Sequence, residues 1–493
     1  MILLKVTPTY TKIEGLEDIE LIDAISDALS YFEPGYRYAL AFKMGKWDGK
    51  RRLLQKSLKF PSGLLDSVER ILKKKDIEYE TRIGYSFPDA EEVLPWKGPR
   101  LYPYQEDAVD IALDKKGGML KMATGAGKTF IISQLVAELN LPTVVYTVSL
   151  DLLSQMQETL ESSLGIEVGV IGGGQCKIRD INVCSVWTAG LAFGQKIGKS
   201  YDDEIESDTW SPGEEQRFDI CEMIENSKVA ILDEAQFAAA ASIQMILRNS
   251  KSAVYKYGFT ATPWRTAGDD ILLEAAFGKR IVDINASTLI DKGYLVPPKI
   301  AFRDMPKYPK VLPKKWPAIK SSYINNNDVR NQILIDNTTK LLEMGRRPLL
   351  LFRELAHGKS LLSMMPADVR TRMVTGRLSR EERDVIRQEF KDGEVDCIIA
   401  STVYDQGIDI KELDALVLCA GGKSTAKALQ RIGRVIRADH EGGKKDALIV
   451  ETFDQTHYME DHSIIRHDIY RTEPAFKIKM GPAMESRVGR RRK

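Results

Sequence analysis

The segment Ala123-Thr-Gly-Ala-Gly-Lys-Thr129 has the residue types that surround a phosphate chain, placed between a short apolar run and a predicted helix. Its glycines let backbone N–H groups close around a phosphate, and the helix N-terminus adds a favourable dipole. Lys128 can then reach the β- and γ-phosphates, while the Thr129 hydroxyl can bind Mg²⁺. The residues predicted to hold the phosphates are Thr124, Gly125, Ala126, Gly127, Lys128 and Thr129.

Two adjacent carboxylates, Asp233 and Glu234, end the apolar run that begins at Val229. At the carboxyl end of a strand the chain turns, so both side chains can approach the phosphates. Asp233 is predicted to hold Mg²⁺ with Thr129, and Glu234 to polarise the attacking water. Such a pair is common alone, but after an apolar strand and downstream of a phosphate loop it indicates nucleotide hydrolysis.

A third group lies in the segment Ala428-Leu-Gln-Arg-Ile-Gly-Arg-Val-Ile-Arg437. Gln430, Arg434 and Arg437 recur at helical spacing, so they are predicted to share one helix face. An arginine supplied by a second domain stabilises the charge that spreads over the γ-phosphate oxygens during transfer. The alternative interpretation is a basic helix facing solvent.

From Leu101 onward, short apolar runs alternate with helical patterns, which predicts parallel sheets covered by helices. The pattern breaks in the proline- and lysine-rich stretch Val296 to Trp316 and then resumes. The expected division is a small α+β domain (1–95), a first α/β domain (100–290), a linker (291–330), a second α/β domain (331–475) and a basic tail (476–493).

Within the first 95 residues, helical spacing at 16–31 and 64–74 predicts two helices, and extended segments are expected at 1–13 and 77–83, so the segment is predicted to be a small α+β unit. A hairpin is predicted over Tyr36 to Leu54, with Asp48-Gly49 as its turn. Between Arg37 and Lys75 there are 12 basic residues and three acidic ones. Lys50, Arg51 and Arg52 are therefore predicted to contact a nucleic-acid backbone, and a solvated charged surface is the alternative.

Composition sets the remaining bounds. The chain has 493 residues with 43% apolar and 29% charged content, which suits two or three globular domains. No apolar run approaches the length of a membrane span, and the five cysteines form no C-x-x-C pair. A cytoplasmic, reducing compartment is expected. The five histidines show no metal-ligand spacing.

These motifs, in their order, resemble the motor motifs of superfamily 2 helicases from Leu101 to Asp454. The resemblance implies two tandem RecA-like parallel-sheet domains after a small α+β N-terminal domain, with ATP and Mg²⁺ as cofactors. It implies nucleotide contacts from Tyr104, Gln105, Gly407 and Asp409. It implies nucleic-acid contacts from Ser149, Thr188, Thr375, Ser401 and Thr402. It implies that Thr260 and Thr262 couple hydrolysis to movement.

The N-terminal runs 42–54 and 60–65 are similar to the corresponding part of the UvsW-type helicases of phages. That resemblance implies an ATP-dependent DNA helicase that acts on forks, D-loops and four-way junctions in recombination, repair or replication. It implies DNA as partner, no membrane, and the host cell cytoplasm as location. Asp233-Glu-Ala-Gln236 departs from the Asp-Glu-Ala-Asp of common RNA helicases, and Gln430 stands where those have histidine. An RNA remodeller, or a duplex translocase of the restriction type, stays open as the alternative.

Overall fold

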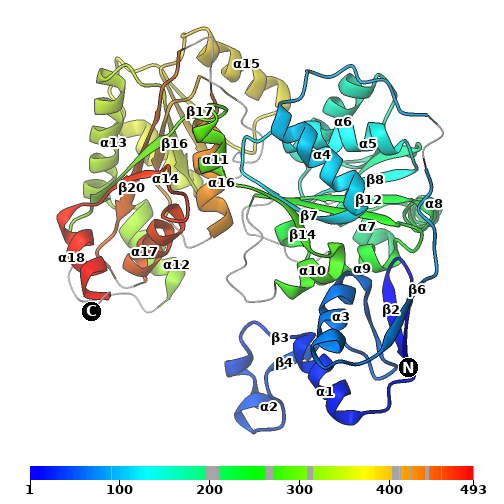
Figure 1. Cartoon of the computed structure of the whole chain (residues 1–493). Helices are drawn as coiled ribbons and strands as arrows, with labels where there is room; N and C mark the ends of the chain where they lie inside the picture. Colours follow the sequence, from blue (N-terminus) through cyan, green and yellow to red (C-terminus); the bar gives the residue numbers. More distant parts are fainter. Residues whose placement is uncertain are drawn as a thin grey trace. The chain divides into compact units, whose positions relative to one another are not determined.

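The computed structural model describes residues 1–89, 92–195, 208, 210–261, 270–307, 315–401, 410, 412–421, 425–438, 443–456 and 458–491 (Figure 1). The chain divides into two compact units. The first consists of Met1–Met122 with Gly127–Asp283, and the second of Ala123–Ala126 with Ile284–Lys493. No helix among the described residues has the length and apolar character to cross a bilayer.

The N-terminal domain is a small α+β unit, as predicted. Its four-stranded sheet has the order β5-β2-β1-β6, with β1 antiparallel to β2 and parallel to β6. The elements are β1 (Ile2–Val6), β2 (Tyr10–Glu14), α1 (Ile19–Ala28), β5 (Lys59–Pro61), α3 (Leu65–Lys74) and β6 (Tyr79–Ile83). Leu4, Ile25, Val68 and Leu72 form its core, all fully buried. The helical and strand periods of the sequence place these side chains on the inward faces.

A lobe, defined as residues 30–52, extends from this domain (Figure 1). The hairpin predicted over residues 36–54 is wrong, because β4 (Lys50–Arg52) pairs antiparallel with the earlier β3 (Ser30–Phe32). Between them lie a 3-10 turn (Tyr36–Tyr38) and the short helix α2 (Leu40–Lys43). Stacking of Phe32 on Tyr36 and an edge contact of Tyr36 with Phe42, at centroid distances of 4.8 and 4.9 Å, hold this excursion closed.

The first α/β domain is built on an eight-stranded sheet of order β10-β9-β11-β8-β12-β13-β7-β14. Strands β7, β8, β11, β12 and β13 run parallel, as predicted, and β9, which was not predicted, is parallel to β11, while β10 is antiparallel to β9. The strands are β7 (Gly117–Met122), β8 (Thr143–Thr147), β9 (Gly169–Gly172), β10 (Gln175–Lys177), β11 (Ile181–Ser185), β12 (Val229–Asp233), β13 (Tyr255–Thr260) and β14 (Arg280–Ile284).

Helices cover both faces of this sheet, which lies between α5 and α6 on one side and α7 and α9 on the other (Figure 1). The helices are α4 (Pro103–Lys115), α5 (Lys128–Leu139), α6 (Leu150–Leu164), α7 (Val186–Ala192), α8 (Glu214–Asn226), α9 (Ala241–Asn249) and α10 (Ile271–Phe277). This is the layered arrangement of a RecA-like domain.

The second unit holds a seven-stranded sheet of order β17-β18-β16-β19-β20-β15-β21, in which every strand is parallel to its neighbours. Its strands are β15 (Pro298–Asp304), β16 (Pro348–Phe352), β17 (Thr371–Val374), β18 (Cys397–Ser401), β19 (Ala415–Leu418), β20 (Ala447–Phe453) and β21 (Lys477–Lys479). Its helices are α11 (Ala286–Asp291), α12 (Trp316–Lys320), α13 (Asp328–Glu343), α14 (Leu355–Met364), α15 (Arg380–Lys391), α16 (Thr425–Val435), α17 (Met459–Tyr470) and α18 (Pro482–Arg491).

The second sheet extends beyond the residues 331–475 expected for it. Strand β15 falls in the expected linker, yet it lies between β20 and β21, and β21 falls in the expected tail. The Glu473 carboxylate accepts from the backbone N–H of Ser287 at 2.9 Å and from its hydroxyl at 2.7 Å, which fixes the start of α11 to this unit. Asp304 caps α18 in the same way, accepting from the Ala483 N–H at 2.8 Å.

Candidate ATPase site and nucleic-acid surface

The phosphate loop follows β7 and ends where α5 begins at Lys128, as predicted. Gly125 and Gly127 have φ angles of +86° and +74°, in the left-handed region that favours glycine. A side chain at Gly127 would bring its Cβ within 2.3 Å of the Gln105 Nε2. The positive φ therefore favours glycine here, and any side chain would also displace the Gln105 amide. Thr124, Gly125 and Ala126 group with the second unit, whereas Lys128 and Thr129 belong to the first.

Gln105 lies next to this loop, in the first turn of α4. Its side chain is buried and its Oε1 accepts from the Tyr102 N–H at 2.8 Å, which leaves Nε2 beside Gly127. Tyr104 is also buried and stacks against Tyr102 with ring centroids 6.0 Å apart. The structure thus brings the expected adenine-contacting glutamine against the phosphate loop.

Asp233 and Glu234 stand at the carboxyl end of β12. Burial, and next the neighbouring Glu234 carboxylate, raise the pKa of Asp233 to about 6, while the Lys128 ammonium acts in the opposite direction. The three charges predicted to act together therefore interact in the folded chain. Glu234 has a φ of +59°, unusual for a residue with a side chain, so the chain turns sharply directly after Asp233. Its N–H donates to the Asp233 Oδ1 at 2.9 Å, which closes that turn.

Two hydrogen bonds connect Glu234 to the next strand. The Gln236 side chain donates to the Glu234 Oε2 at 2.6 Å and accepts from the Thr260 hydroxyl at 2.6 Å. Thr260 ends β13, the neighbour of β12 in the sheet. The sequence motifs did not assign Gln236 a role, although its position two residues after Glu234 was the available signal. Thr262, the second residue expected to couple hydrolysis to movement, lies outside the described residues.

The donor set fits a nucleotide-bound divalent cation rather than a protein-only cage. No group of three or more histidine, cysteine, aspartate or glutamate side chains gathers for a metal within the described part of the chain. Thr129 and Asp233 are the two oxygen donors predicted for Mg²⁺, which is usually held by one or two protein oxygens together with phosphates and water.

The predicted arginine helix, residues 428–437, ends earlier than expected. Gln430 and Arg434 lie four residues apart on α16, so they share a helix face. Arg437 lies beyond the last helical residue, Val435, and forms an isolated antiparallel bridge with Leu295 instead. The expectation that all three share one helix face is therefore wrong for Arg437. Pairing with the chain that leads into β15 has overridden helix propensity there.

The expected nucleic-acid contacts on the RecA-like domains are mostly enclosed in this structure. Ser149 accepts from the Leu152 N–H at 3.4 Å at the start of α6, and Thr188 donates to Asp208 at 2.7 Å. Ser149, Thr188, Thr375 and Ser401 are all buried. In this conformation the protein itself encloses these four hydroxyls. Their contacts with nucleic acid therefore stay predictions. Thr402, Gly407 and Asp409 lie outside the described residues.

The three basic residues predicted from the N-terminal stretch each have an acidic partner. Lys50 pairs with Asp27 at 2.6 Å. Arg51 binds Glu33 through two nitrogens, at 2.6 and 2.9 Å. Arg52 pairs with Asp48 at 2.5 Å and, with a backbone hydrogen bond from Lys50, lowers the pKa of Asp48 to about 2. The sequence did not show this pairing, because Asp27 and Glu33 lie outside the basic run.

Three family models match the chain in the order of its domains. The model "DNA helicase UvsW, N-terminal" matches residues 7–83, "Type III restriction enzyme, res subunit" matches 99–265, and "Helicase conserved C-terminal domain" matches 324–439.

Similar proteins extend over nearly the whole chain. The DNA 3'-5' translocase XPB2 of Sulfurisphaera tokodaii is 24% identical over 87% of this chain and 94% of its own length. The ATP-dependent DNA helicase uvsW of Enterobacteria phage T4 is 24% identical over 87% of this chain and 86% of its own length. Among solved structures, the ATP-dependent Type ISP restriction-modification enzyme LlaBIII bound to DNA has a TM-score of 0.56 at 15% identity. The match covers 85% of this chain and 34% of that one, and it shows a shared fold.

The two largely parallel sheets, the phosphate loop with its carboxylates and these matches define the class: the chain is an ATP-dependent enzyme of the DNA-helicase type, similar to the superfamily 2 helicases. Within that class it resembles the UvsW type, since the model matched by its N-terminal domain is that of UvsW.

Proposed function

We propose that this helicase unwinds or branch-migrates branched DNA, such as forks, D-loops and four-way junctions. The match of residues 7–83 to the UvsW N-terminal model and the similarity to the phage T4 helicase uvsW support this proposal. The observation that carries it is the surface of the lobe, residues 30–52, which combines exposed cations with exposed apolar side chains.

The cations of that surface are Arg37, Lys43 and Lys46, all exposed. The two acids within the lobe, Glu33 and Asp48, are already bound to Arg51 and Arg52. The outer face of the lobe is therefore positively charged. Phosphate contacts of this kind add affinity without reading sequence.

The apolar members are Tyr38, Leu40 and Met44, with 84%, 72% and 55% of their surfaces exposed. Their neighbours Tyr36 and Phe42 form the inner aromatic contacts of the lobe. An exposed aromatic ring between cations suits unpaired bases, because bases stack on such rings while the phosphates meet the cations. Duplex DNA alone offers no unpaired base, so we infer that the lobe binds the unpaired bases at a branch point.

Contacts in the first unit join the N-terminal domain to the first RecA-like domain. Ser67 donates to Glu274 at 3.0 Å, and Lys279 pairs with Asp66 at 2.6 Å. The backbone of Gly63 lies so close to Glu274 that a Cβ would approach its carbonyl to 2.1 Å. A branch held by the lobe would thus keep a fixed position relative to the first motor domain.

For hydrolysis we infer that Lys128 binds the β- and γ-phosphates and Glu234 orients the attacking water. Gln236 and Thr260 hold the Glu234 carboxylate in place through their hydrogen bonds. When bound, Mg²⁺ would supply charge neutralisation at the phosphates, held by Thr129 and Asp233. The inferred adenine contacts are Tyr104 and Gln105, further inferred nucleotide contacts are Gly407 and Asp409, and the inferred transition-state contacts are Gln430, Arg434 and Arg437.

A duplex translocase that does not separate strands is the second candidate, favoured by the restriction-enzyme model over residues 99–265. An RNA remodeller is the third. ATPase rates with single-stranded DNA, duplex DNA, a four-way junction and RNA, together with strand-displacement assays, discriminate among them. Branched-DNA action predicts the highest ATPase stimulation and product formation on the junction. Stimulation by linear duplex without displacement would favour the translocase instead.

The lobe is tested by charge reversal. Lys43→Glu with Lys46→Glu should weaken junction binding and lower its salt slope by about two, because each lysine that neutralises a phosphate accounts for about one unit of slope. The matched control is Lys177→Glu with Lys340→Glu, which reverses two exposed lysines on β10 and α13. Replacing Lys50, Arg51 and Arg52 together with alanine is a weaker test, because each replacement also leaves an acidic partner unpaired.

A further inference from the structure

A cavity of about 600 Å³ lies between the N-terminal domain and the first RecA-like domain. It opens at the amino ends of β7 and β13, which begin at Gly117 and Tyr255, whereas the phosphate loop follows the carboxyl end of β7. The cavity is therefore separate from the ATPase site. Its size is within the range of pockets that hold small-molecule ligands.

The lining of this cavity is strongly basic. Its charged members are Lys115, Lys116, Arg248, Lys256, Lys279 and Arg280, opposed by Asp66. Three of the cations form salt bridges with carboxylates: Lys115 with Asp114, Lys279 with Asp66 and Arg280 with Asp283. For the other three, Lys116, Arg248 and Lys256, no carboxylate partner is found among residues whose positions the structure describes. A pocket with three unneutralised cations favours an anion.

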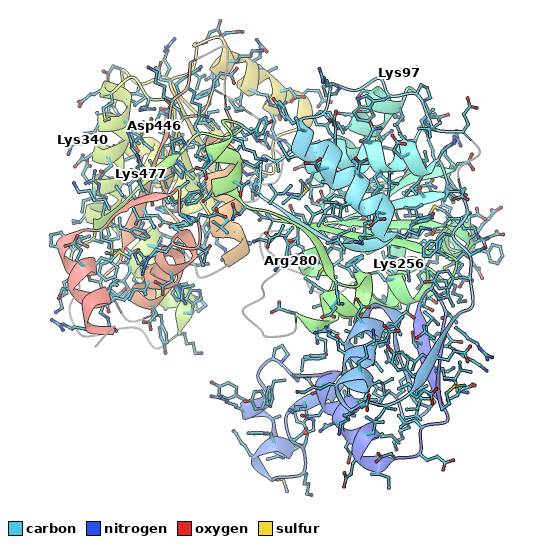
Figure 2. All side chains as sticks on the ribbon, viewed as in Figure 1. Lys97, Lys256, Arg280, Lys340, Asp446 and Lys477 are labelled. Carbon is cyan, nitrogen blue, oxygen red and sulfur yellow. The ribbon has the colours of Figure 1, made fainter. Side chains whose placement is uncertain are left out.

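Lys256 is the innermost of these cations. Its Nζ donates to the carbonyls of Pro8 at 3.0 Å and Leu247 at 3.3 Å, two neutral acceptors contributed by the two domains. Burial lowers the pKa of the Lys256 ammonium to about 7, because desolvation disfavours the charged form. Figure 2 shows Lys256 and Arg280 on the side of the first RecA-like domain that faces the N-terminal domain. An anion in the cavity would supply the missing counter-charge.

Aromatic rings complete the lining. Tyr85 and Phe87 meet edge to face with centroids 5.4 Å apart, and both line the cavity. The Lys116 Nζ lies 4.7 Å from the centre of the Phe87 ring. In many proteins an aromatic ring stacks on the base while nearby cations bind the phosphate, and this combination binds nucleotides without reading the base.

We propose that this cavity binds a second phosphate-bearing ligand of the nucleotide class, with its phosphate at Lys116, Arg248 and Lys256 and its base against Tyr85 and Phe87. The ligand is a free nucleotide or the 5′-terminal nucleotide of a DNA strand, which share this chemistry. Since the cavity walls come from two domains, occupation ties the N-terminal domain to the motor.

Site-resolved labelling tests this assignment on the full chain. An amine-reactive reagent is applied near pH 7.5, and the modification of Lys256 is followed by peptide mass mapping. The probes are thymidine 5′-monophosphate, a 5′-phosphorylated oligothymidylate, thymidine and inorganic phosphate. At four times its Kd a bound probe slows labelling about fivefold, following 1 + [L]/Kd. Protection by the monophosphate, the oligonucleotide or both supports the proposal and identifies the source.

Two surface variants keep the proposal falsifiable even if changes at Lys256 unfold the chain. Lys116→Glu with Arg248→Glu should weaken probe binding by about tenfold or more, whereas Lys177→Glu with Lys340→Glu should not. ATPase driven by saturating single-stranded DNA should be unchanged in both. Equal protection by inorganic phosphate would overturn the nucleotide assignment. Undiminished Lys256 labelling with millimolar monophosphate and oligonucleotide would overturn the site altogether.

Discussion

The Thr260 hydroxyl donates a 2.6 Å hydrogen bond to Gln236, which in turn donates to Glu234 at 2.6 Å. The two ends of this chain of hydrogen bonds are the predicted water-orienting carboxylate and the end of the adjacent strand. A change at either strand end therefore alters where the Glu234 carboxylate points. The glutamine that replaces the last aspartate of the common RNA-helicase motif makes both bonds, because its amide both donates and accepts.

Gln236→Ala and Thr260→Val should lower kcat for ATP by about 10- to 100-fold, the usual cost of removing a group that orients an active-site ligand. KM for ATP should change little, because neither side chain is predicted to touch the nucleotide. Steady-state ATPase kinetics on single-stranded DNA measure both parameters. A purely structural role would instead lower the unfolding midpoint and leave kcat of the remaining folded enzyme unchanged.

Arg434→Ala should lower kcat far more than it weakens ATP binding, since an arginine of this kind acts on charge that develops in the transition state. Removal of such a residue costs roughly 10³- to 10⁵-fold in related phosphoryl-transfer enzymes. Arg303→Ala, at an exposed position on β15, is the control. Near-normal turnover by Arg434→Ala would remove this residue from the proposed site.

Lys256 should impose a pH dependence on stability. Its pKa is lowered from 10.5 to about 7 in the folded chain, so between these values the unfolded chain binds more protons. The free energy of unfolding then rises with pH through this window, by at most about 1.4 kcal/mol per pH unit. Lys256→Met removes that contribution. Urea unfolding at pH 7, 8 and 9 should show a shallower rise for the variant, and parallel curves would show that Lys256 is not a poorly compensated buried charge.

Arg330 should be essential for the stability of the second RecA-like domain. Its fully buried guanidinium binds Asp454 at 2.7 Å and donates to the Cys419 carbonyl at 2.8 Å, so it joins α13 to the ends of two strands. Arg330→Ala leaves Asp454 buried without its partner, which costs about 3–5 kcal/mol. Thermal and urea unfolding measure this destabilisation. Arg330→Met combined with Asp454→Leu should be less destabilised, because no unpaired charge remains.

Much of the motor was predictable from local pattern. The loop Ala123–Thr129 and the pair Asp233–Glu234 are short contiguous segments, and each follows an apolar strand whose period is readable. The central parallel strands of both sheets were predicted for the same reason. The edge strand β21 and its neighbour β15 were not, since they are short or polar and their place depends on partners far along the chain.

The pairing of charges and of strands in the N-terminal domain was harder to predict from the sequence than the motor motifs. Arg51 finds Glu33 only because β4 pairs with β3, and the two residues are 18 positions apart. The Asp48-Gly49 turn signal suggested a local hairpin, but stacking of Tyr36 on Phe32 favours the longer excursion. Long-range contacts of this kind decide which cations bind a carboxylate, as Lys50, Arg51 and Arg52 all do. Lys43 and Lys46 therefore replace this predicted triplet as the sharper test.

Hydrolysis at Glu234 is proposed to drive the remodelling of branched DNA. The most direct measurement follows one labelled four-way junction with wild type, Lys128→Ala and Glu234→Gln, recording ATP turnover and strand products together. We expect junction-dependent products for wild type. Glu234→Gln should reduce turnover by about 10²-fold or more while still binding ATP, and neither variant should form products. Normal turnover by Glu234→Gln, or junction products without ATP hydrolysis, would contradict this role of Glu234.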